Sequence, residues 1–115
     1  MLESVTATAL ASALDGLSLR QRAIAENIAN INTPGYQAKR VQFEDALRAA
    51  IADGTGATDA TVHRSLEPTR LYGNNVNLDT ETLSNIDTVL RFQFAAQALN
   101  GQATSISKAI GQASA

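Results

Sequence analysis

Apolar residues recur at alternating intervals of three and four at both ends of the chain, and no other feature constrains the fold as much. Such heptad spacing places apolar side chains along one side of a helix, where they form a seam for another helix. The sequence therefore predicts two long terminal helices, over residues 7–31 and 79–113. The first seam is Ala7, Leu10, Leu14, Leu17, Gln21, Ile24, Ile28 and Ile31, and the second is Val89, Phe92, Ala96, Leu99, Ala103, Ile106, Ile110 and Ala113.

The predicted fold class is mainly α, with the long N- and C-terminal helices pairing as a coiled-coil hairpin. The chain has 115 residues, which suffice for one small domain. We divide it into an N-terminal helix (1–33), a segment with a turn, a short helix and an irregular stretch (34–78), and a C-terminal helix (79–115). The residues expected to carry helix pairing and assembly are Leu10, Leu14, Leu17, Ile24, Ile28, Phe92, Leu99, Ile106 and Ile110.

The first helix has a clear stop signal in Thr33-Pro34-Gly35-Tyr36. Proline disfavours helical backbone at the preceding residue, and glycine accepts a positive φ angle. Proline followed by glycine at the two central positions is typical of a type II turn. We therefore expect the chain to reverse here.

The middle of the chain gives weaker signals. Apolar residues at 43, 47, 50 and 51 lie on one narrow face and predict a short helix. Residues 54–75 indicate an irregular or mobile segment, within which Thr61–Leu66 is compatible with an extended strand. Polar and acidic residues at 77, 79 and 81 then predict the capped start of the last helix, with charges that favour its dipole.

Composition excludes several classes of protein. Nine basic and 11 acidic residues give a net charge of -2, which does not fit a nucleic-acid binder. With no cysteine, the chain has no disulfide, thiol nucleophile or thiolate metal site. The N-terminal residues resemble no cleavable signal peptide, and no stretch approaches the roughly 20 apolar residues of a membrane span.

Residues that could carry chemistry are few, so we expect no catalytic, metal or cofactor site. His63 is the single histidine and has no second imidazole or thiolate with which to hold a metal. Glu44-Asp45 and Asp79/Glu81 are best interpreted as first-turn helix charges rather than acid–base pairs. Asn27, Asn30 and Asn32 fit capping and contacts between subunits, and Arg20, Arg22, Lys39 and Arg40 fit a solvated face or ion pairs between subunits.

The heptad seams themselves allow two interpretations. They can form the ordinary core of a two- or three-helix monomer, or they can require other chains to cover them. Two helices of unequal length leave apolar surface exposed when nothing else covers them, and the alanine-rich faces permit close approach of further helices. We favour assembly.

Two segments resemble flagellar basal-body rod proteins. The stretch from Leu19 to Tyr36 contains N-I-A-N, two further residues and T-P-G-Y, and every one of these motif residues is present. The segment around Gly73–Asp79 and the later Leu90–Ala96 resemble the family's C-terminal helix, although position 77 is Asn rather than the common Asp and Phe92 replaces a frequent Tyr. The motif residues are Asn27, Ile28, Ala29, Asn30, Thr33, Pro34, Gly35 and Tyr36, with Asn74, Asn75 and Val76 before the last helix.

Within the family, the short chain is most similar to proximal-rod subunits of the FlgB type, with the FlgC type as a sibling alternative. The resemblance implies a non-enzymatic subunit that polymerises helically through its terminal helices, transmits torque and lines an export channel. The implied location is the basal-body rod in the periplasmic space. The implied partners are other rod subunits, the membrane-embedded ring protein with its rod adaptor, the flagellar type III export apparatus and further copies of the chain, but neither nucleic acid nor a directly spanned membrane.

Two other classes of function stay open on the residues alone. One is a free-standing helical adaptor or export chaperone, which would be a stable monomer or dimer absent from the basal body. The other is an enzyme, which requires a pocket that brings His63 together with carboxylates.

Overall fold

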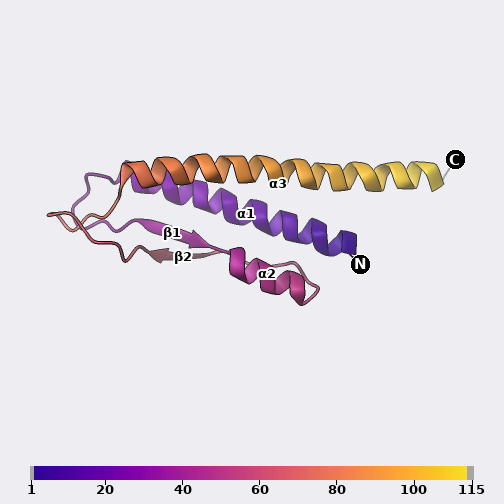
Figure 1. Ribbon diagram of the computed structural model, residues 1–115, viewed down its shortest axis with the longest axis horizontal. Coiled ribbons are helices and arrows are strands. Elements are labelled where there is room, and N and C mark those ends of the chain that lie inside the picture. The colour runs from indigo at the N-terminus through magenta and orange to yellow at the C-terminus, as the bar shows by residue number, and fades with distance from the viewer. Residues whose placement is uncertain (1, 114–115) are drawn as a thin grey trace.

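The computed structural model describes residues 2–113, which contain three helices and two short strands (Figure 1). In chain order these are α1 (Leu2–Ala29), β1 (Lys39–Gln42), α2 (Glu44–Ala52), β2 (Thr61–Arg64) and α3 (Leu78–Ala113). Residues 1, 114 and 115 lie outside the described part, as do the side chains of residues 2, 3 and the predicted seam position Ala113. The mainly helical fold class is confirmed.

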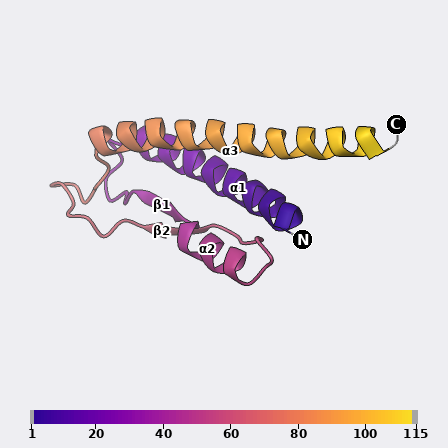
Figure 2. The ribbon, with the colours of Figure 1, turned by 45° about the vertical axis from the view of Figure 1, so that its right-hand side comes forward.

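Helix α1 is the central element of the molecule. Helix α3 packs along one side of it, and β1, β2 and α2 lie on the other side (Figures 1 and 2). Helices α1 and α3 run in opposite directions, so both ends of the chain lie at one end of a body that measures 68 × 25 × 14 Å. The predicted pairing of the two long helices is therefore confirmed.

The apolar core is small and lies where these layers meet. Leu17 and Ala23 of α1 contact Val41 of β1, Phe43 at the start of α2, and Ala95 of α3. Alanine buries little apolar area, and the hydrophobic contribution is roughly 25 cal/mol for each Å² removed from water. A core with so few large side chains leaves much of the arrangement to be set by polar contacts.

The central segment is more ordered than its sequence indicates. Strands β1 and β2 pair antiparallel, with Lys39 opposite Arg64 and Gln42 opposite Thr61. The extended stretch that the sequence allows within residues 61–66 is β2, and the rest of residues 54–75 contains no helix or strand, as the irregular description expects. Sequence did not predict β1, because its four residues Lys-Arg-Val-Gln include one apolar side chain and show no strand pattern.

Local signals set the helix ends. Asn77 caps α3 by accepting a hydrogen bond from the backbone N–H of Thr80 at 3.2 Å. After α1, the backbone N–H of Tyr36 donates to the carbonyl of Thr33 at 3.3 Å, and Gly35 has φ of +75°, as the predicted type II turn requires. The predicted short helix is α2.

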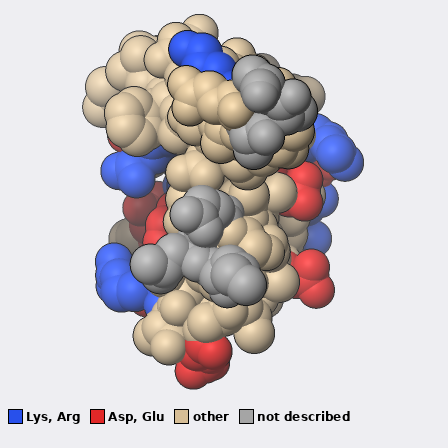
Figure 3. All heavy atoms as spheres, turned by 90° about the vertical axis from the view of Figure 1, so that its right-hand side faces the viewer, with Lys and Arg blue, Asp and Glu red and all other residues tan. Residues whose placement is uncertain are grey.

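The surface of the described residues carries mixed charge. Viewed from the end near both termini, basic and acidic side chains are interspersed around the sides of the molecule (Figure 3). Within residues 2–113, no helix combines the length and apolarity needed to cross a membrane.

Replacing Gly16 by alanine tests the contact between α1 and the start of α2. Alanine favours a helix over glycine by about 1 kcal/mol, but a Cβ atom at position 16 would lie 2.5 Å from Cδ1 of Phe43. Overpacking a core costs about 1–3 kcal/mol, so we expect Gly16→Ala to lower the melting temperature measured by circular dichroism.

Gly101→Ala is the matched control, because it makes the same change in α3 where no neighbouring atom lies within 4 Å. We expect this variant to melt at a slightly higher temperature than the wild type, through helix propensity alone. Equal stabilisation by both variants would show that the Phe43 ring does not pack closely against position 16 of α1.

Candidate functional site

The two sequence motifs meet at the end of the molecule opposite the termini (Figure 1). One comprises the end of α1 and the turn after it, and the other lies directly before α3. Partly buried side-chain hydrogen bonds join the two segments, which are more than forty residues apart in the chain. We call five residues the polar junction: Asn27, Arg40, Asn74, Asn75 and Glu81.

Asn27 lies at the centre of the polar junction, and its side chain is fully buried in α1. Its amide nitrogen donates to the carbonyl of Lys39 at 3.0 Å and to the carboxylate of Glu81 at 3.1 Å. Its oxygen accepts from the backbone N–H of Lys39 at 2.8 Å and from the hydroxyl of Tyr36 at 3.1 Å. One side chain therefore links α1, the turn, β1 and α3.

Glu81 is fully buried at the start of α3, although it carries a charge. Arg40 donates from Nη1 to its Oε1 at 2.6 Å, while Asn27 donates to its Oε2. Glu81 does lie in the first turn, but the sequence interpretation missed its buried ion pair. The seven-residue spacing of Glu81, Thr88 and Ala95 is a signal that could have placed Glu81 on the inner face, where the structure buries all three, although it does not indicate Arg40 as the partner.

Asn74 fixes the end of α1 to the segment before α3. Its amide nitrogen donates to the carbonyls of Asn30 and Thr33, both at 2.8 Å. Its oxygen accepts from the backbone N–H of Val76 at 2.8 Å and from Arg70 at 3.0 Å. Arg70 also donates to two backbone carbonyls, which holds the loop in one conformation.

Asn75 fixes the end of the strand pair to the segment before α3. Its amide nitrogen donates to the carbonyls of Ser65 and Glu67, both at 3.1 Å. Its oxygen accepts from the backbone N–H of Ala38 at 2.6 Å. The segment between β2 and α3 is thus anchored by specific side-chain bonds to backbone groups.

The remaining motif residues complete the turn. Asn30 donates to the carbonyl of Glu26 at 2.8 Å, and its oxygen accepts from the hydroxyl of Thr33 at 3.0 Å, which is the capping role that the sequence indicates. Burial raises the pKa of Tyr36, whose hydroxyl donates to Asn27. Of the other motif positions, Val76 is buried, whereas Ile28, Ala29, Pro34 and Gly35 are exposed.

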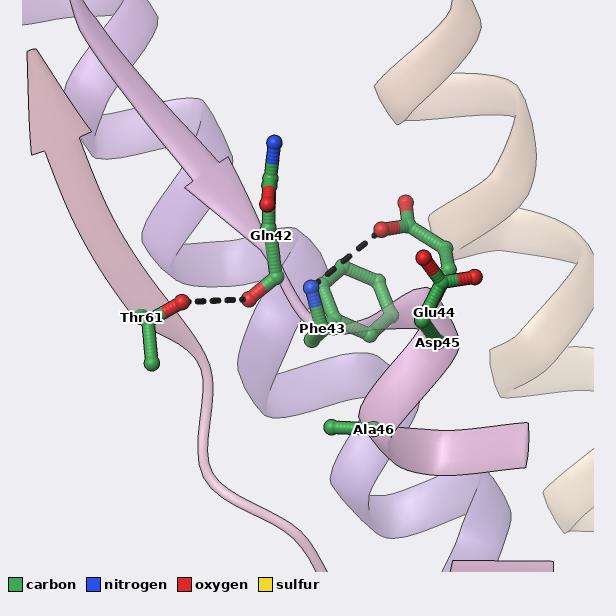
Figure 4. A pocket seen from close by; sticks show the side chains of 6 residues that line it. All are labelled: Gln42, Phe43, Glu44, Asp45, Ala46 and Thr61. Carbon is green, nitrogen blue, oxygen red and sulfur yellow. Dashed lines mark hydrogen bonds between the residues drawn. The ribbon is translucent and has the colours of Figure 1, made fainter. Parts of the chain in front are cut away.

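A second group of contacts holds α2 against α1. The guanidinium of Arg20 donates to Glu44 at 2.6 Å and to the carbonyl of Val41 at 2.7 Å, and it lies 4.9 Å from the centre of the Phe43 ring. Glu44 in turn accepts from the backbone N–H of Phe43 at 3.2 Å (Figure 4). Burial raises the pKa of Glu44, but these hydrogen bonds and Arg20 outweigh it, so the net pKa lies below its ordinary value.

The basic residues singled out in the sequence act mainly within the chain. The sequence predicts a solvated face or ion pairs between subunits, and three of the four residues instead form ion pairs within the chain, of which Lys39–Glu26 lies on the exposed surface. Arg22 is exposed, and the internal ion pairs of the other three are Arg20–Glu44, Lys39–Glu26, Arg40–Glu81 and Arg40–Glu67.

Other candidate groups are not brought together. His63 lies exposed on β2, away from the carboxylates of a catalytic or metal site. Among residues 2–113, no three His, Cys, Asp or Glu side chains gather in a way that could hold a metal ion.

The nine residues predicted to carry helix pairing fall into two groups. Leu10, Leu14, Leu17 and Phe92 belong to one apolar cluster, Ile24 is buried and Leu99 is half-buried. Ile28, Ile106 and Ile110 are 37 %, 44 % and 64 % exposed, so they do not contribute a buried pairing within one chain. Their expected part in assembly stays a prediction.

Comparison with known proteins shows the family to which the chain belongs. Residues 8–37, which form most of α1 and the turn after it, match the family described as flagella basal body rod protein. The flagellar basal body rod protein FlgB of Escherichia coli K12 is 31 % identical over 112 residues, covering 78 % of this chain and 81 % of that protein. The chain belongs to the FlgB family of flagellar basal body rod proteins.

Further FlgB relatives agree with this assignment. The protein of Bacillus subtilis strain 168 is 29 % identical over 119 residues, covering 91 % of this chain and 92 % of its own length. The FlgB protein of Borrelia hermsii is 32 % identical over 91 residues, covering 59 % of this chain and 67 % of its own length. The chain is therefore a structural subunit of the flagellar rod, and the family match reaches the α1 side of the polar junction.

Replacing Asn27 by alanine tests the polar junction. The change removes four hydrogen bonds and leaves buried partners in β1 and α3 unsatisfied. We expect a loss of about 2–3 kcal/mol in the free energy of unfolding, measured by urea denaturation. Asn32→Ala, at an exposed position of the same motif, should change stability by less than about 0.5 kcal/mol. Similar losses in the two variants would contradict the central role of Asn27.

Acid titration tests the contact between Arg20 and Glu44. A carboxyl whose pKa is lowered in the folded state stabilises the fold above its unfolded pKa, near 4.5, and that stabilisation is lost as pH falls through the folded pKa. The difference in melting temperature between wild type and Glu44→Gln should therefore shrink from neutral pH to about pH 3. For Arg20→Gln the difference should shrink over the same pH range but leave a constant part, because Arg20 also contacts the Val41 carbonyl and the Phe43 ring. A difference that is constant with pH would contradict the assigned pair.

Proposed function

We propose that the chain is a proximal-rod subunit that polymerises helically through α1 and α3, transmits torque and lines the export channel. On this proposal it is exported through the flagellar type III apparatus. It then assembles on the membrane-embedded ring protein and its rod adaptor, in the periplasmic part of the basal body. Membership in the FlgB family supports the rod location.

One observation carries the proposal: α3 exposes large apolar side chains although it already packs on α1. A helix that exposes many large apolar side chains on a folded protein is a candidate for contact with another protein. The exposed residues run from the first turns of α3 to its last part and are Leu78, Leu83, Ile86, Leu90, Phe94, Ile106 and Ile110. This distribution supports burial of α3 between neighbouring subunits.

The polar junction supports a mechanical role. A shaft that transmits torque needs subunits whose parts do not rotate against one another. Buried polar groups whose hydrogen bonds are satisfied favour one rigid arrangement of the groups they join. The three asparagines of the junction meet this condition, whereas Nη2 of Arg40 is buried without a hydrogen bond. Asn27, Asn74 and Asn75 join α1, the strands and α3 in this way.

Quantitative mass spectrometry of basal bodies stripped of filament and hook tests the proposal. Recovery of the chain alongside other rod subunits is the expected result. Absence from intact basal bodies, together with abundant chain in the cytosol, would contradict the rod role and favour a free-standing adaptor or export chaperone.

Ile28→Asp tests whether α1 takes part in assembly. Ile28 is partly exposed in the single chain, so the variant should fold, but assembly would place a charge in an apolar contact. We expect the variant to be lost from purified basal bodies while its melting temperature stays close to that of wild type.

Ile51→Asp is the matched control, because Ile51 is a similarly exposed isoleucine on α2, outside the terminal helices. We expect this control to be incorporated normally. Normal rod formation by Ile28→Asp would show that Ile28 is not part of the assembly surface.

A further inference from the structure

The two-stranded sheet has one edge that α1 closes. Strand β1 lies between α1 and β2 (Figures 1 and 2). On the α1 side, the Asn27 side chain bonds both the N–H and the C=O of Lys39, and Arg20 donates to the carbonyl of Val41. These side chains satisfy the outer backbone groups of β1 as a neighbouring strand would.

The other edge of the sheet, formed by β2, is open. In an antiparallel ladder, pairs of residues that exchange hydrogen bonds alternate with pairs whose backbone groups point outward. Lys39 and Val41 point toward α1, so their partners Arg64 and Val62 point their N–H and C=O groups away from β1. Within residues 2–113 no group bonds to these four, and every residue of β2 is exposed. Such an edge is a template for a further strand.

Basic side chains gather at this open edge. His63 and Arg64 are neighbours on β2, they lie opposite Arg40 and Lys39 of β1, and neither strand contains an acidic residue. Lys39 and Arg40 are paired with carboxylates of α1 and α3. Arg64 instead donates to the carbonyl of Gln37 at 3.3 Å, and in the described part of the chain neither it nor His63 forms an ion pair. The open edge therefore presents basic side chains that lack a counter-charge.

We propose that β2 binds an extended acidic peptide segment of a partner protein, which adds to the sheet as its third strand. The backbone of the segment pairs with the outward N–H and C=O groups of Val62 and Arg64. Its carboxylates lie beside His63 and Arg64, and an apolar residue packs on Val62, whose side chain is 48 % exposed. This contact goes beyond the proposed rod function, because it uses the central segment and not the terminal helices.

Charge decides between an acidic strand and a second copy of the chain. The β2 edge of a second copy would bring the same His63 and Arg64 to the contact. Like charges that face each other across a strand pair destabilise it, whereas opposite charges stabilise it. The basic edge therefore disfavours its own copy and favours an acidic segment.

Amide hydrogen exchange, followed by NMR on the full-length chain, tests the proposal. The probe is the peptide Thr-Thr-Glu-Glu-Val-Thr-Thr, which in antiparallel register places its glutamates opposite Arg64 and His63 and its valine opposite Val62. We expect the N–H groups of Val62 and Arg64 to exchange several-fold more slowly with the peptide than without it. The N–H of His63, which already points toward β1, should exchange at the same rate in both samples.

Two further peptides separate charge from strand pairing. A peptide with glutamine in place of both glutamates keeps the backbone contacts and should bind roughly fivefold more weakly, since exposed ion pairs contribute little each. A peptide with an N-methylated valine keeps both charges but lacks one N–H that pairs with β2. This peptide should give no protection at Val62 and Arg64.

Variants of the chain test the same contact from the other side. Val62→Pro removes one outward N–H while the ladder to β1 and all charges stay, so the melting temperature should be kept and peptide binding lost. Arg64→Glu should weaken binding by roughly fivefold or more, because a repulsion replaces an attraction. Lys108→Glu is the matched control, since it makes the same charge change at an exposed position in the last part of α3 and should leave the affinity unchanged.

Three results would overturn the proposal. The first is no protection of Val62 and Arg64 at the highest peptide concentration. The second is equal protection by the N-methylated peptide, which would show attraction of charges without strand pairing. The third is protection without peptide that rises with chain concentration, which would show a second copy on the edge. None of them bears on recovery of the chain in basal bodies, so the rod proposal is tested separately.

Discussion

The Glu81 carboxylate is removed from water, and a buried charge is tolerated only where a counter-charge and hydrogen bonds surround it. Arg40 supplies the counter-charge from β1, and Asn27 supplies a hydrogen bond from α1. These two donors fix the positions of their own elements relative to the start of α3. The same Asn27 side chain then holds both backbone groups of Lys39, so the path of β1 is fixed as well.

These polar contacts are important because the apolar core contains few large side chains. Several buried residues of the two long helices are small, among them Ala9, Ala23 and Ala95. Phe43 supplies the one aromatic ring among the buried core residues described. Alanine-rich surfaces pack in several registers with similar energy. A buried polar group does not, because a shifted register leaves it without its partners. The polar junction therefore selects one register for α1 and α3.

Much of the fold could be predicted from sequence, because heptad spacing and turn chemistry act locally. The pairing of the long helices, the turn at Thr33–Tyr36, the cap at Asn77 and the short helix α2 all follow from such signals. Strand β1 could not be predicted, since its pairing depends on β2 and on Asn27 rather than on its own pattern. The ion pair between Arg40 and Glu81 joins residues 41 positions apart, and no local pattern specifies such a partner. The heptad spacing predicts that Ile106 and Ile110 contribute to helix pairing, yet within one chain α1 does not cover these exposed residues.

The central position of α1 has a consequence for how the chain acquires its structure. The helix is the first element of the chain, and its principal neighbour α3 is the last, with the hydrogen bond between Asn27 and Glu81 spanning 54 residues. Contacts of such long sequence separation raise contact order and slow folding, because a large loop must close before they stabilise anything. A chain that lacks its last third leaves one side of α1 bare and Asn27 without its carboxylate partner. Completion of the C-terminal helix is therefore the step that commits the whole chain to its folded state.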